Sequence, residues 1–489
     1  MAESLKRRTL GNLALSGGMR VATIALQVAV NVVLARNLSS IDYGIVSYAQ
    51  IVVTLLALLS ECGLSSVAVQ SPDLPPKALQ TGFTLRLALS AAAVAIILLA
   101  GPAIAGLLGA PAVAPVMNLL AVGFVINSLS FVPSVLLLRA LDYRTLVSAQ
   151  TVGALVNAAV ATATALAGWG YWSVAAGMIA SACASTIHMN LSVRARTNLG
   201  LDLAEARRYL SGGLRLLSAG LLTVFIMNAD NLVVGTFRGP EMLGFYALAF
   251  GWGSKICDLL ASVLNSVIFP TFARIQSDPA RLGDAFLKTL LLAGFISFGG
   301  HATLFLVSED LLRFLLADGS EKWLPALETL RWFCLYGMVR APLEAFSSLM
   351  MSAGRFGTVA RANMATALVM AILLFPALEV RGIEGVALAV AIGYGAQYLV
   401  YWPEARRLPG LTAARVAASL APGALAAAIL VAAALIVPLE RLAEGQVRFW
   451  AGLCTCGIAY LALFGMVTGG RPYREVFAAF RMRRTERTG

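Results

Sequence analysis

Long apolar runs alternate with short polar segments along the whole sequence. A run of ~20 apolar residues is the length at which an α-helix crosses the ~30 Å hydrocarbon core of a bilayer. The pattern therefore predicts an all-α integral membrane protein with about fourteen transmembrane helices. The expected helices span roughly residues 10–35, 43–69, 78–100, 113–138, 146–167, 171–193, 209–235, 243–270, 286–307, 324–351, 358–378, 384–403, 412–437 and 447–468.

The distribution of basic residues predicts the orientation of these helices. An even number of helices places both termini on one side of the membrane, and the basic residues concentrate in the segments on that side. Positively charged segments stay in the cytoplasm, so we expect both termini there. The first apolar run follows Lys6, Arg7 and Arg8 and continues to about Ala35 without a small-residue cleavage site. This run is interpreted as a transmembrane helix, not as a signal peptide.

Two short motifs occur twice, at equivalent places in the predicted topology. Leu15–Arg20 opens the first helix and the similar Leu210–Arg215 opens the seventh, while Ala140–Thr145 follows the fourth helix and Ala353–Thr358 follows the tenth. A repeat with an even number of helices gives two halves of the same orientation, related by a pseudo-two-fold axis along the membrane normal, with a substrate path between them. The predicted divisions are an N-lobe at 1–197, a C-lobe at 205–407, a terminal helix pair at 412–470 and a basic cytoplasmic tail at 471–489.

Composition excludes a soluble protein. The 489 residues are 59% hydrophobic and 13% charged, and their mean hydropathy is +0.81, whereas soluble domains have about 45–50% apolar and about 25% charged residues. The formal net charge of +12 would suggest a nucleic-acid partner in a soluble protein. Here the basic residues are explained by membrane topology, so we expect no nucleic-acid binding.

Polar residues are costly inside a bilayer, so their placement is informative. On the first, second and eighth predicted helices they follow helical spacing and form stripes along one face. Such a stripe either hydrogen-bonds to a neighbouring helix or lines a water-filled cavity, and charged residues at depth favour the cavity. The residues expected to line it include Ser16, Gln27, Asn31, Glu61 and Asp258.

Four basic residues deep in predicted helices suggest that this cavity binds an anion: Arg20, Arg215, Lys255 and Arg340. Arg20 and its repeat counterpart Arg215 have no acid three or four residues away. Lys255 and Arg340 are followed at i+3 and i+4 by Asp258 and Glu344, so local ion pairs are an alternative for these two. A phosphate or diphosphate fits unpaired cations, because arginine binds its oxygens with a bidentate fork.

Two acids, Glu61 and Asp230, have no such local partner. An intramembrane carboxylate can bind a coupling proton or sodium ion, and Asn228 and Asn231 stand beside Asp230 as further oxygen ligands. Alternatively, each carboxylate neutralises a distant arginine. We therefore expect no bound cofactor and, at most, coupling to an H⁺ or Na⁺ gradient.

The sequence lacks the residue patterns that disulfide bonds, metal sites or nucleotide hydrolysis require. The six cysteines have neither disulfide nor metal-site spacing, the only two histidines lie on different predicted helices, and no Walker phosphate-binding loop occurs. The predicted outer loops are short, whereas membrane polymerases and ligases of surface glycans usually have a larger outer domain. We therefore expect a transporter, not an enzyme, with no metal site.

Four motifs resemble the polysaccharide transporter (PST) family, in its Wzx/WzxC-like branch. They are Leu34–Leu38 with Asp42-Tyr43-Gly44, Phe269–Arg274, Lys322-Trp323 and Ala353-Gly354-Arg355. This family belongs to the multidrug/oligosaccharidyl-lipid/polysaccharide (MOP) superfamily, and the resemblance spans about residues 5–410. It implies a MATE-like fold of two lobes that rock in alternating access around a cationic central cavity.

The resemblance also implies a function. Family members move undecaprenyl-diphosphate-linked oligosaccharide repeat units to the periplasmic leaflet of the bacterial inner membrane for exopolysaccharide, capsule or O-antigen synthesis. Membrane lipids, a polysaccharide polymerase and export machinery are the implied partners, and we expect a monomer because each half already supplies one cavity wall. Related lipid II flippases bind sodium between the seventh and eleventh helices. Asn363 is the candidate on the eleventh helix here, which has no acid before Glu379.

Two alternatives stay open from the sequence. A multidrug exporter of the same superfamily predicts an acidic, aromatic cavity for organic cations, which Glu61 and Asp230 allow and the unpaired Arg20 and Arg215 oppose. A membrane glycan polymerase or ligase is the second alternative, and the short outer loops oppose it.

Overall fold

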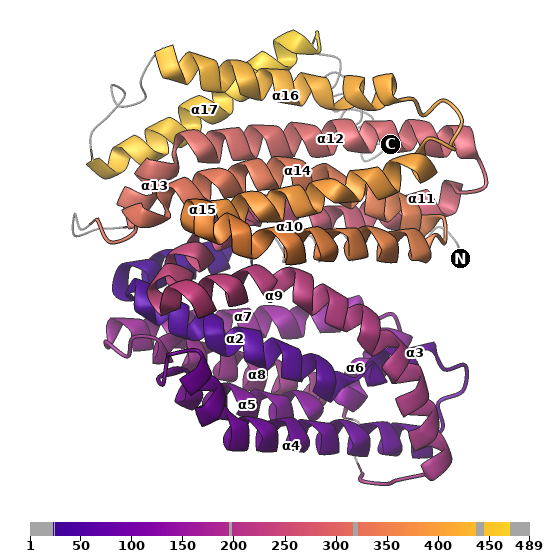
Figure 1. The fold of residues 1–489 in the computed structure, drawn as a ribbon. Coiled ribbons are helices and arrows are strands. Elements are labelled where there is room, and N and C mark those ends of the chain that lie inside the picture. Colours follow the sequence, from indigo (N-terminus) through magenta and orange to yellow (C-terminus); the bar gives the residue numbers. More distant parts are fainter. Residues whose placement is uncertain (1–22, 24, 195–197, 316–320, 437–444, 470–489) are drawn as a thin grey trace, which may run out of the picture. The chain divides into compact units, whose positions relative to one another are not determined.

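The computed structural model describes residues 23, 25–194, 198–315, 321–436 and 445–469. Within these ranges every regular element is a helix (Figure 1). The prediction of an all-α protein is therefore confirmed, because the apolar runs that suggested membrane spans do form helices. Arg20 and Ser16 lie outside the described residues.

Nine helices of the described chain are long and apolar enough to cross a membrane, or ten if the bent pair α5 (Val113–Ser128) and α6 (Phe131–Arg139) forms one span. Two of the nine are unusually long: α9 (Leu203–Gly253) and α15 (Phe356–Ala405). Each consists of two helices joined at a glycine with non-helical dihedral angles, Gly239 in α9 and Gly382 in α15. The chain is thus a multi-pass membrane protein, while the number of fourteen helices stays a prediction.

The chain divides into two compact units, Met1–Ala247 and Leu248–Gly489. The first contains α2 (Ser40–Glu61), α3 (Leu64–Gln70), α4 (Pro76–Leu107), α5, α6, α7 (Tyr143–Leu166), α8 (Trp172–Val193) and most of α9. The second contains α10 (Lys255–Val263), η1 (Leu264–Ile268), α11 (Phe269–Ile275), α12 (Pro279–Leu306), α13 (Ser308–Leu315), η2 (Leu324–Ala326), α14 (Leu327–Ser352), α15, α16 (Ala413–Ile436) and α17 (Gly445–Val467). The predicted lobes were defined by sequence repeats, and they stay a prediction.

The predicted second helix is broken in the first unit. Cys62 and Gly63 adopt positive φ angles of 43° and 65°, which end α2 and interrupt the helix before α3. Both oxygens of the Glu61 carboxylate accept main-chain hydrogen bonds there, from the N–H groups of Gly63 (2.8 Å) and Ser65 (3.0 Å). Glu61 therefore satisfies donors that the break leaves without helical partners.

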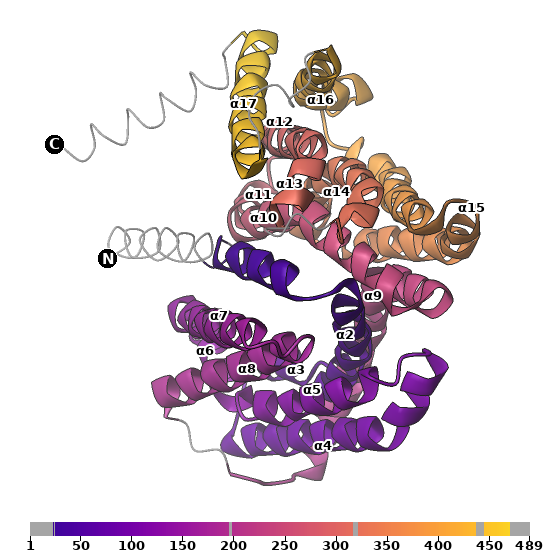
Figure 2. The same cartoon turned by 90° about the vertical axis from the view of Figure 1, so that its left-hand side faces the viewer.

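Small residues set the helix packing of the first unit. α7 and α8 form a close hairpin (Figure 2) in which Gly153 faces Ser181 and Gly177 faces Asn157. α9 follows α2 in the opposite direction, with Gly220 against Leu58. Small residues let helix backbones approach closely, which drives helix association where both solvent and side chains are apolar.

The second unit is built around α12. This helix packs against α14 on one side and against α16 and α17 on the other (Figure 1). Phe272 of the Phe269–Arg274 motif in α11 packs into an apolar cluster of this unit. In the same cluster the rings of Phe286 and Phe346 meet edge to face, with their centres 4.9 Å apart. Tyr460 of α17 donates a hydrogen bond to the carbonyl of Phe295 in α12 at 2.9 Å.

The predicted eighth helix is irregular in the structure. A residue outside the helix, Ser254, separates α9 from α10, and the π-helical turn η1 follows α10. The Phe269 N–H bonds to the carbonyl of Leu264 in this turn. Irregular backbone at membrane depth is tolerated only where protein or a water-filled cavity satisfies its polar groups, and π-helical turns are frequent at functional sites.

One of the repeated motifs has the same backbone conformation in both copies. Leu141 and Gly354 follow the ends of α6 and α14 with positive φ angles of 54° and 70°. Asp142 and Arg355 then donate their N–H groups to Leu137 and Met350, five residues earlier in each case. The sequence match between these corners therefore corresponds to a structural match.

Candidate functional site

Arg340 lies inside the second unit, midway along α14, and only 9% of the residue is exposed. Two carboxylates face its guanidinium. Glu344, one turn further along α14, lies 3.6 Å from its Nε, and Asp258 of α10 lies 3.8 Å from an Nη. Both distances are those of ion pairs without a direct hydrogen bond. The local pair with Glu344 that the i+4 spacing allowed therefore forms.

Two tyrosines complete the surroundings of Arg340. Its guanidinium donates a hydrogen bond to the Tyr336 hydroxyl at 3.0 Å and lies 5.6 Å from the ring centre of Tyr394 in α15. Tyr336 and Tyr394 meet edge to face at 5.3 Å, and Phe333 extends the aromatic cluster. Cation–π attraction of this kind stabilises a buried guanidinium.

The guanidinium keeps unused hydrogen-bonding capacity. An arginine side chain has five N–H donors. Within the described residues Arg340 donates one hydrogen bond, and its buried Nε has no hydrogen-bond partner although Glu344 lies at ion-pair distance. The side chain of Asp258 is 54% exposed. An anion that displaced this exposed carboxylate would find N–H donors available on Arg340.

The break before α10 positions the other charged residues. Lys255 opens α10 and is half-buried, and its side chain makes no hydrogen bond or ion pair with the part of the chain that the structure describes. The spacing allowed a pair between Lys255 and Asp258, but Asp258 pairs with Arg340 instead. The site thus brings Lys255, Asp258, Arg340 and Glu344 into one region in which two cations are balanced by two acids.

His301 of α12 contacts the backbone at the break between α9 and α10. Its Nε2 lies 3.2 Å from the carbonyl oxygen of Gly253, the residue at which α9 ends, and its Nδ1 lies 2.8 Å from the carbonyl oxygen of Ser297. Gly337 of α14 packs so closely on the imidazole that a β carbon would meet Nε2. The histidine therefore holds α10 and α14 at the separation that lets Asp258 reach Arg340.

Asp230 is the buried acid of the first unit, at 2% exposure. It accepts hydrogen bonds from the Tyr246 hydroxyl (2.8 Å) and from both the main-chain and the side-chain N–H of Asn231 (2.8 and 3.2 Å). Asn228 turns away and donates to the carbonyl of Val224 at 2.9 Å. The Asp230 carboxylate thus already accepts hydrogen bonds on both oxygens, and ion binding there with Asn228 as a further ligand stays a prediction.

The remaining predicted site residues have varied surroundings. Asn363 of α15 accepts a long hydrogen bond from Gln397 at 3.5 Å. Gln27 is exposed and Asn31 is half-buried in the helix that precedes α2. Arg215 lies within α9, but its side chain is outside the described part. In the polar stripe on α2, Gln50 donates a hydrogen bond to the sulfur of Met178 in α8 at 3.4 Å, and the predicted cavity lining stays a prediction.

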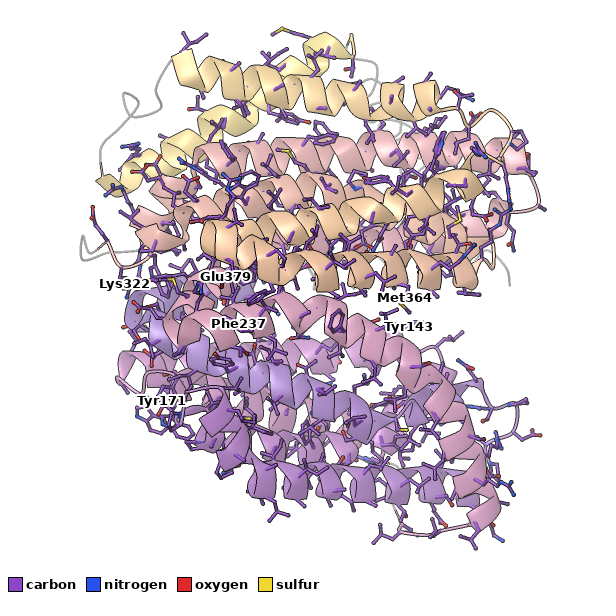
Figure 3. All side chains as sticks on the ribbon, in the orientation of Figure 1. Tyr143, Tyr171, Phe237, Lys322, Met364 and Glu379 are labelled. Atoms are coloured by element: carbon purple, nitrogen blue, oxygen red, sulfur yellow. The ribbon has the colours of Figure 1, made fainter. Side chains whose placement is uncertain are left out.

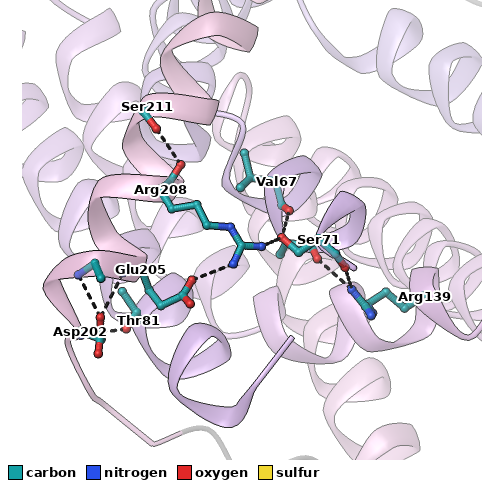
Figure 4. A network of polar contacts seen from close by, with 10 residues as sticks. Val67, Ser71, Thr81, Arg139, Asp202, Glu205, Arg208 and Ser211 are labelled. Atoms are coloured by element: carbon teal, nitrogen blue, oxygen red, sulfur yellow. Dashed lines mark hydrogen bonds and ion pairs between the residues drawn. The ribbon is translucent and has the colours of Figure 1, made fainter. Parts of the chain in front are cut away.

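A second polar network fastens the ends of four helices in the first unit (Figure 4). Arg139 at the end of α6 donates to the carbonyls of Ala68, Ser71 and Pro72, and Arg208 of α9 donates to the Ser71 hydroxyl and to Glu205. Asp202 starts α9 by accepting from the N–H of Glu205 at 3.1 Å. These arginines were attributed to membrane topology alone, and the structure gives them bonding roles as well.

Sequence reasoning missed the tyrosines around Arg340. Tyr336 stands four residues before Arg340 on the same helix face, so its spacing contained a signal. Tyr394 comes from a different helix, and nothing in the sequence indicated that contact. Among the described residues, no three His, Cys, Asp or Glu side chains are grouped so that they could hold a metal ion.

Comparisons with known proteins agree with the motifs. The chain is 24% identical over 402 residues to the lipopolysaccharide biosynthesis protein WzxC of Escherichia coli (strain K12), covering 80% of this chain and 78% of that protein. It is also 24% identical over 280 residues to the succinoglycan biosynthesis transport protein ExoT of Rhizobium meliloti (strain 1021), covering 56% of each.

Among solved structures, the fold matches the lipid II flippase MurJ in its inward closed conformation, with a TM-score of 0.79, 15% identity and coverage of 95% of this chain and 100% of that one. The sequence profile described as "Polysaccharide biosynthesis protein" matches residues 33–328, more than half of the chain. The chain therefore belongs to the polysaccharide biosynthesis protein family, and it is a multi-pass membrane protein with the fold of the flippase MurJ.

Proposed function

We propose that this protein flips undecaprenyl-diphosphate-linked oligosaccharide repeat units from the cytoplasmic to the periplasmic leaflet of a bacterial inner membrane. The product would supply exopolysaccharide, capsule or O-antigen synthesis. Similarity to WzxC and ExoT supports the polysaccharide pathway, and the name of the structural neighbour MurJ supports a lipid-linked substrate. In this proposal both termini lie in the cytoplasm, as the basic segments predict.

The observation that carries the proposal is the buried guanidinium of Arg340. A charged group kept inside a membrane protein marks a substrate or ion path more often than a structural need. Arg340 is held by aromatic rings and by carboxylates at ion-pair distance, so its N–H donors are positioned but not consumed. A diphosphate that approached from the side of the exposed Asp258 would accept hydrogen bonds from these donors. Lys255, which has no ion pair within the described residues, would be a second cation for it.

The transport cycle would use the two acids as temporary partners. With no substrate present, Asp258 and Glu344 neutralise Arg340 and keep the cost of its burial low. The diphosphate competes for the same guanidinium, and its release on the far side restores the ion pairs. Arg20 and Arg215 would extend the cationic path, and coupling to H⁺ or Na⁺ at Asp230 would supply direction.

A second candidate function is export of organic cations. The fold also matches an inward-facing multidrug resistance MATE transporter of the MOP superfamily, with a TM-score of 0.61 and 16% identity. Asp258, Glu344, Tyr336 and Tyr394 together form an acidic and aromatic site, which suits a ligand cation. Arg340 opposes this candidate, because it already occupies the position between the rings.

The test is mass spectrometry of polyprenyl lipids from cells that lack this gene and keep upstream synthesis intact. Complementation would compare the wild type with Arg340→Ala and Arg340→Lys, which retains the charge and loses the fork. Arg313→Ala is the matched control, since Arg313 forms exposed ion pairs elsewhere in the second unit. Immunoblots of membranes report whether each variant accumulates.

We expect the complete diphosphate-linked repeat unit to build up in the deletion strain and with both Arg340 variants, and to return to normal with the wild type and Arg313→Ala. Normal lipid levels with an Arg340 variant at wild-type abundance would contradict the role of Arg340. Normal lipid levels and polymer in the deletion strain itself would contradict the flippase, and loss of drug resistance there would favour the exporter.

A further inference from the structure

Three arginines converge on one carboxylate in the second unit. Glu404 near the end of α15 is 14% exposed in its side chain, and its Oε2 lies 2.8 Å from Arg355 and 2.9 Å from Arg407, while Oε1 lies 3.6 Å from Arg361. Arg355 also donates to the main-chain carbonyl of Glu404 at 3.3 Å. We refer to Arg355, Arg361, Glu404 and Arg407 as the Glu404 cluster.

The Glu404 cluster carries an excess of positive charge at the surface. One carboxylate compensates one of the three arginines, and the side chains of Arg361 and Arg407 are 66% and 65% exposed. Arg406 next to it is also exposed and makes no ion pair with the described part of the chain. Three guanidiniums around a half-buried acid leave outward N–H donors that no group of the described chain uses.

The corner before α15 does not require an arginine, because the first unit builds the same corner with Asp142. Arg355 occupies the backbone position that Asp142 occupies in the first unit, with matching hydrogen bonds around it. Asp142 caps α7 through the N–H and hydroxyl of Thr145, whereas Arg355 makes no capping hydrogen bond at the start of α15. An arginine in place of a better capping residue indicates that Arg355 has a role other than helix capping.

The Glu404 cluster lies at the two ends of α15, a helix pair that is long and apolar enough to span a membrane. The chain reverses direction at Gly382, between the two helices of α15. The contact between Arg355 and Glu404 shows that the beginning and the end of α15 lie side by side. Phe356, directly after Arg355, is 64% exposed. A basic cluster beside an exposed aromatic ring at a membrane boundary combines the contacts that a lipid headgroup and its upper acyl chain offer.

We propose that the Glu404 cluster binds the phosphate of an anionic phospholipid, of which phosphatidylglycerol is the example to test. The arginines share the phosphate oxygens through charge-assisted hydrogen bonds, and Phe356 lies against the acyl chains. Glu404 keeps the three guanidiniums close together when no lipid is bound. This proposal does not depend on the transported substrate.

The test is native mass spectrometry of the purified full-length protein after delipidation in detergent. Phosphatidylglycerol, phosphatidylcholine and farnesyl diphosphate are added separately to the wild type and to Arg361→Gln/Arg407→Gln, which keeps the pair of Arg355 with Glu404. The control Arg274→Gln/Arg281→Gln removes the same charge from two exposed arginines whose side chains have no hydrogen bond or ion pair in the described ranges.

We expect phosphatidylglycerol to bind the cluster variant roughly tenfold more weakly than the wild type, and the control variant to match the wild type. Phosphatidylcholine should bind all three weakly. An equal loss of phosphatidylglycerol affinity in the cluster and control variants would overturn the proposal. It would also be overturned if the cluster substitutions weakened the binding of farnesyl diphosphate and left the binding of phosphatidylglycerol unchanged. Arg361→Gln by itself gives a second measurement on a minimally altered protein, and unchanged lipid affinity there would also count against the proposal.

Discussion

Gly44 in α2 and Gly244 in α9 lie where the two helices cross, and each glycine packs against the backbone of the other helix. A β carbon on Gly44 would collide with the carbonyl oxygen of Pro240, and one on Gly244 would collide with the carbonyl oxygen of Ser40. Ser40 and Pro240 each stand four residues before the glycine of their own helix. Equivalent segments of a parallel repeat are expected to meet in this way at a pseudo-two-fold axis.

The crossing predicts that neither glycine tolerates a side chain. Gly44→Ala or Gly244→Ala should lower the free energy of unfolding by roughly 1–3 kcal/mol, because the neighbouring atom is main chain and cannot rotate away. Thermal unfolding of the purified variants in detergent measures the effect. Gly457→Ala in α17 is the control, since nothing lies within 4 Å of its β-carbon position. Unchanged melting of both crossing variants would show that the helices separate easily there.

Glu61 is predicted to act through the backbone. Its two oxygens hold the N–H groups of Gly63 and Ser65 at the break between α2 and α3, so Glu61→Ala should cost about 1–3 kcal/mol of stability. Glu61→Gln retains one acceptor and should lose less. Transport per folded molecule should be similar for both variants. A Glu61→Gln protein of normal stability that fails to transport would instead favour an ion-coupling role.

The course of the backbone was predictable where apolar length decided it. The apolar runs that predicted α7 and α8 begin and end within three residues of the observed helices, because the bilayer fixes the length of an apolar helix. Each of α4 and α12 extends seven residues beyond its apolar run at one end. The helix breaks after α2 and before α10 could not be seen in the sequence, because they depend on side chains that bond to the backbone groups freed there. Glu61 accepts a hydrogen bond from the Gly63 N–H, and His301 contacts the Gly253 carbonyl. These hydrogen bonds depend on the folded arrangement of the chain, which the periodicity of apolar residues does not reveal.

The site was predictable only along single helices. The pair of Arg340 with Glu344 followed from their spacing, because residues four apart share a helix face. The contacts of Arg340 with Asp258 and Tyr394 join three helices, and Lys255 was a closer partner for Asp258 in sequence. A single sequence contains no distances between helices, so it could indicate which charges are buried but not which ones meet.

The aromatic contact of Arg340 predicts a difference between two substitutions of Tyr394. Tyr394→Phe keeps a ring 5.6 Å from the guanidinium, and we expect near-normal transport. Tyr394→Leu removes a cation–π contact of about 0.5–2 kcal/mol, so transport should fall roughly two- to thirtyfold at equal abundance. Accumulation of the lipid-linked repeat unit in complemented deletion cells reports the difference. Equal activity of the two variants would exclude an energetic role for the ring.

Asp142 predicts a pH-dependent contribution to stability outside the spanning helices. Hydrogen bonds from the Thr145 hydroxyl and N–H hold the pKa of Asp142 below its ordinary value, with Arg144 adding a smaller electrostatic effect. The ordinary pKa of aspartate is about 3.9. The charged carboxylate therefore stabilises the fold at every pH above about 4, and this contribution disappears as the pH falls through the lowered pKa.

The measurement is thermal unfolding of the wild type and Asp142→Ala between neutral pH and about pH 3. At neutral pH the variant should be less stable by about 1 kcal/mol, the usual value of a helix cap, and the difference should shrink below about pH 4 because protonation removes the same interaction. Asp142→Asn still accepts from the Thr145 N–H, so it should lose less and should show no such titration. Asp73→Ala is the control, because Asp73 is exposed and accepts no hydrogen bond from the described chain. A difference that stays constant down to the lowest pH would mean that Asp142 stabilises the corner by shape alone.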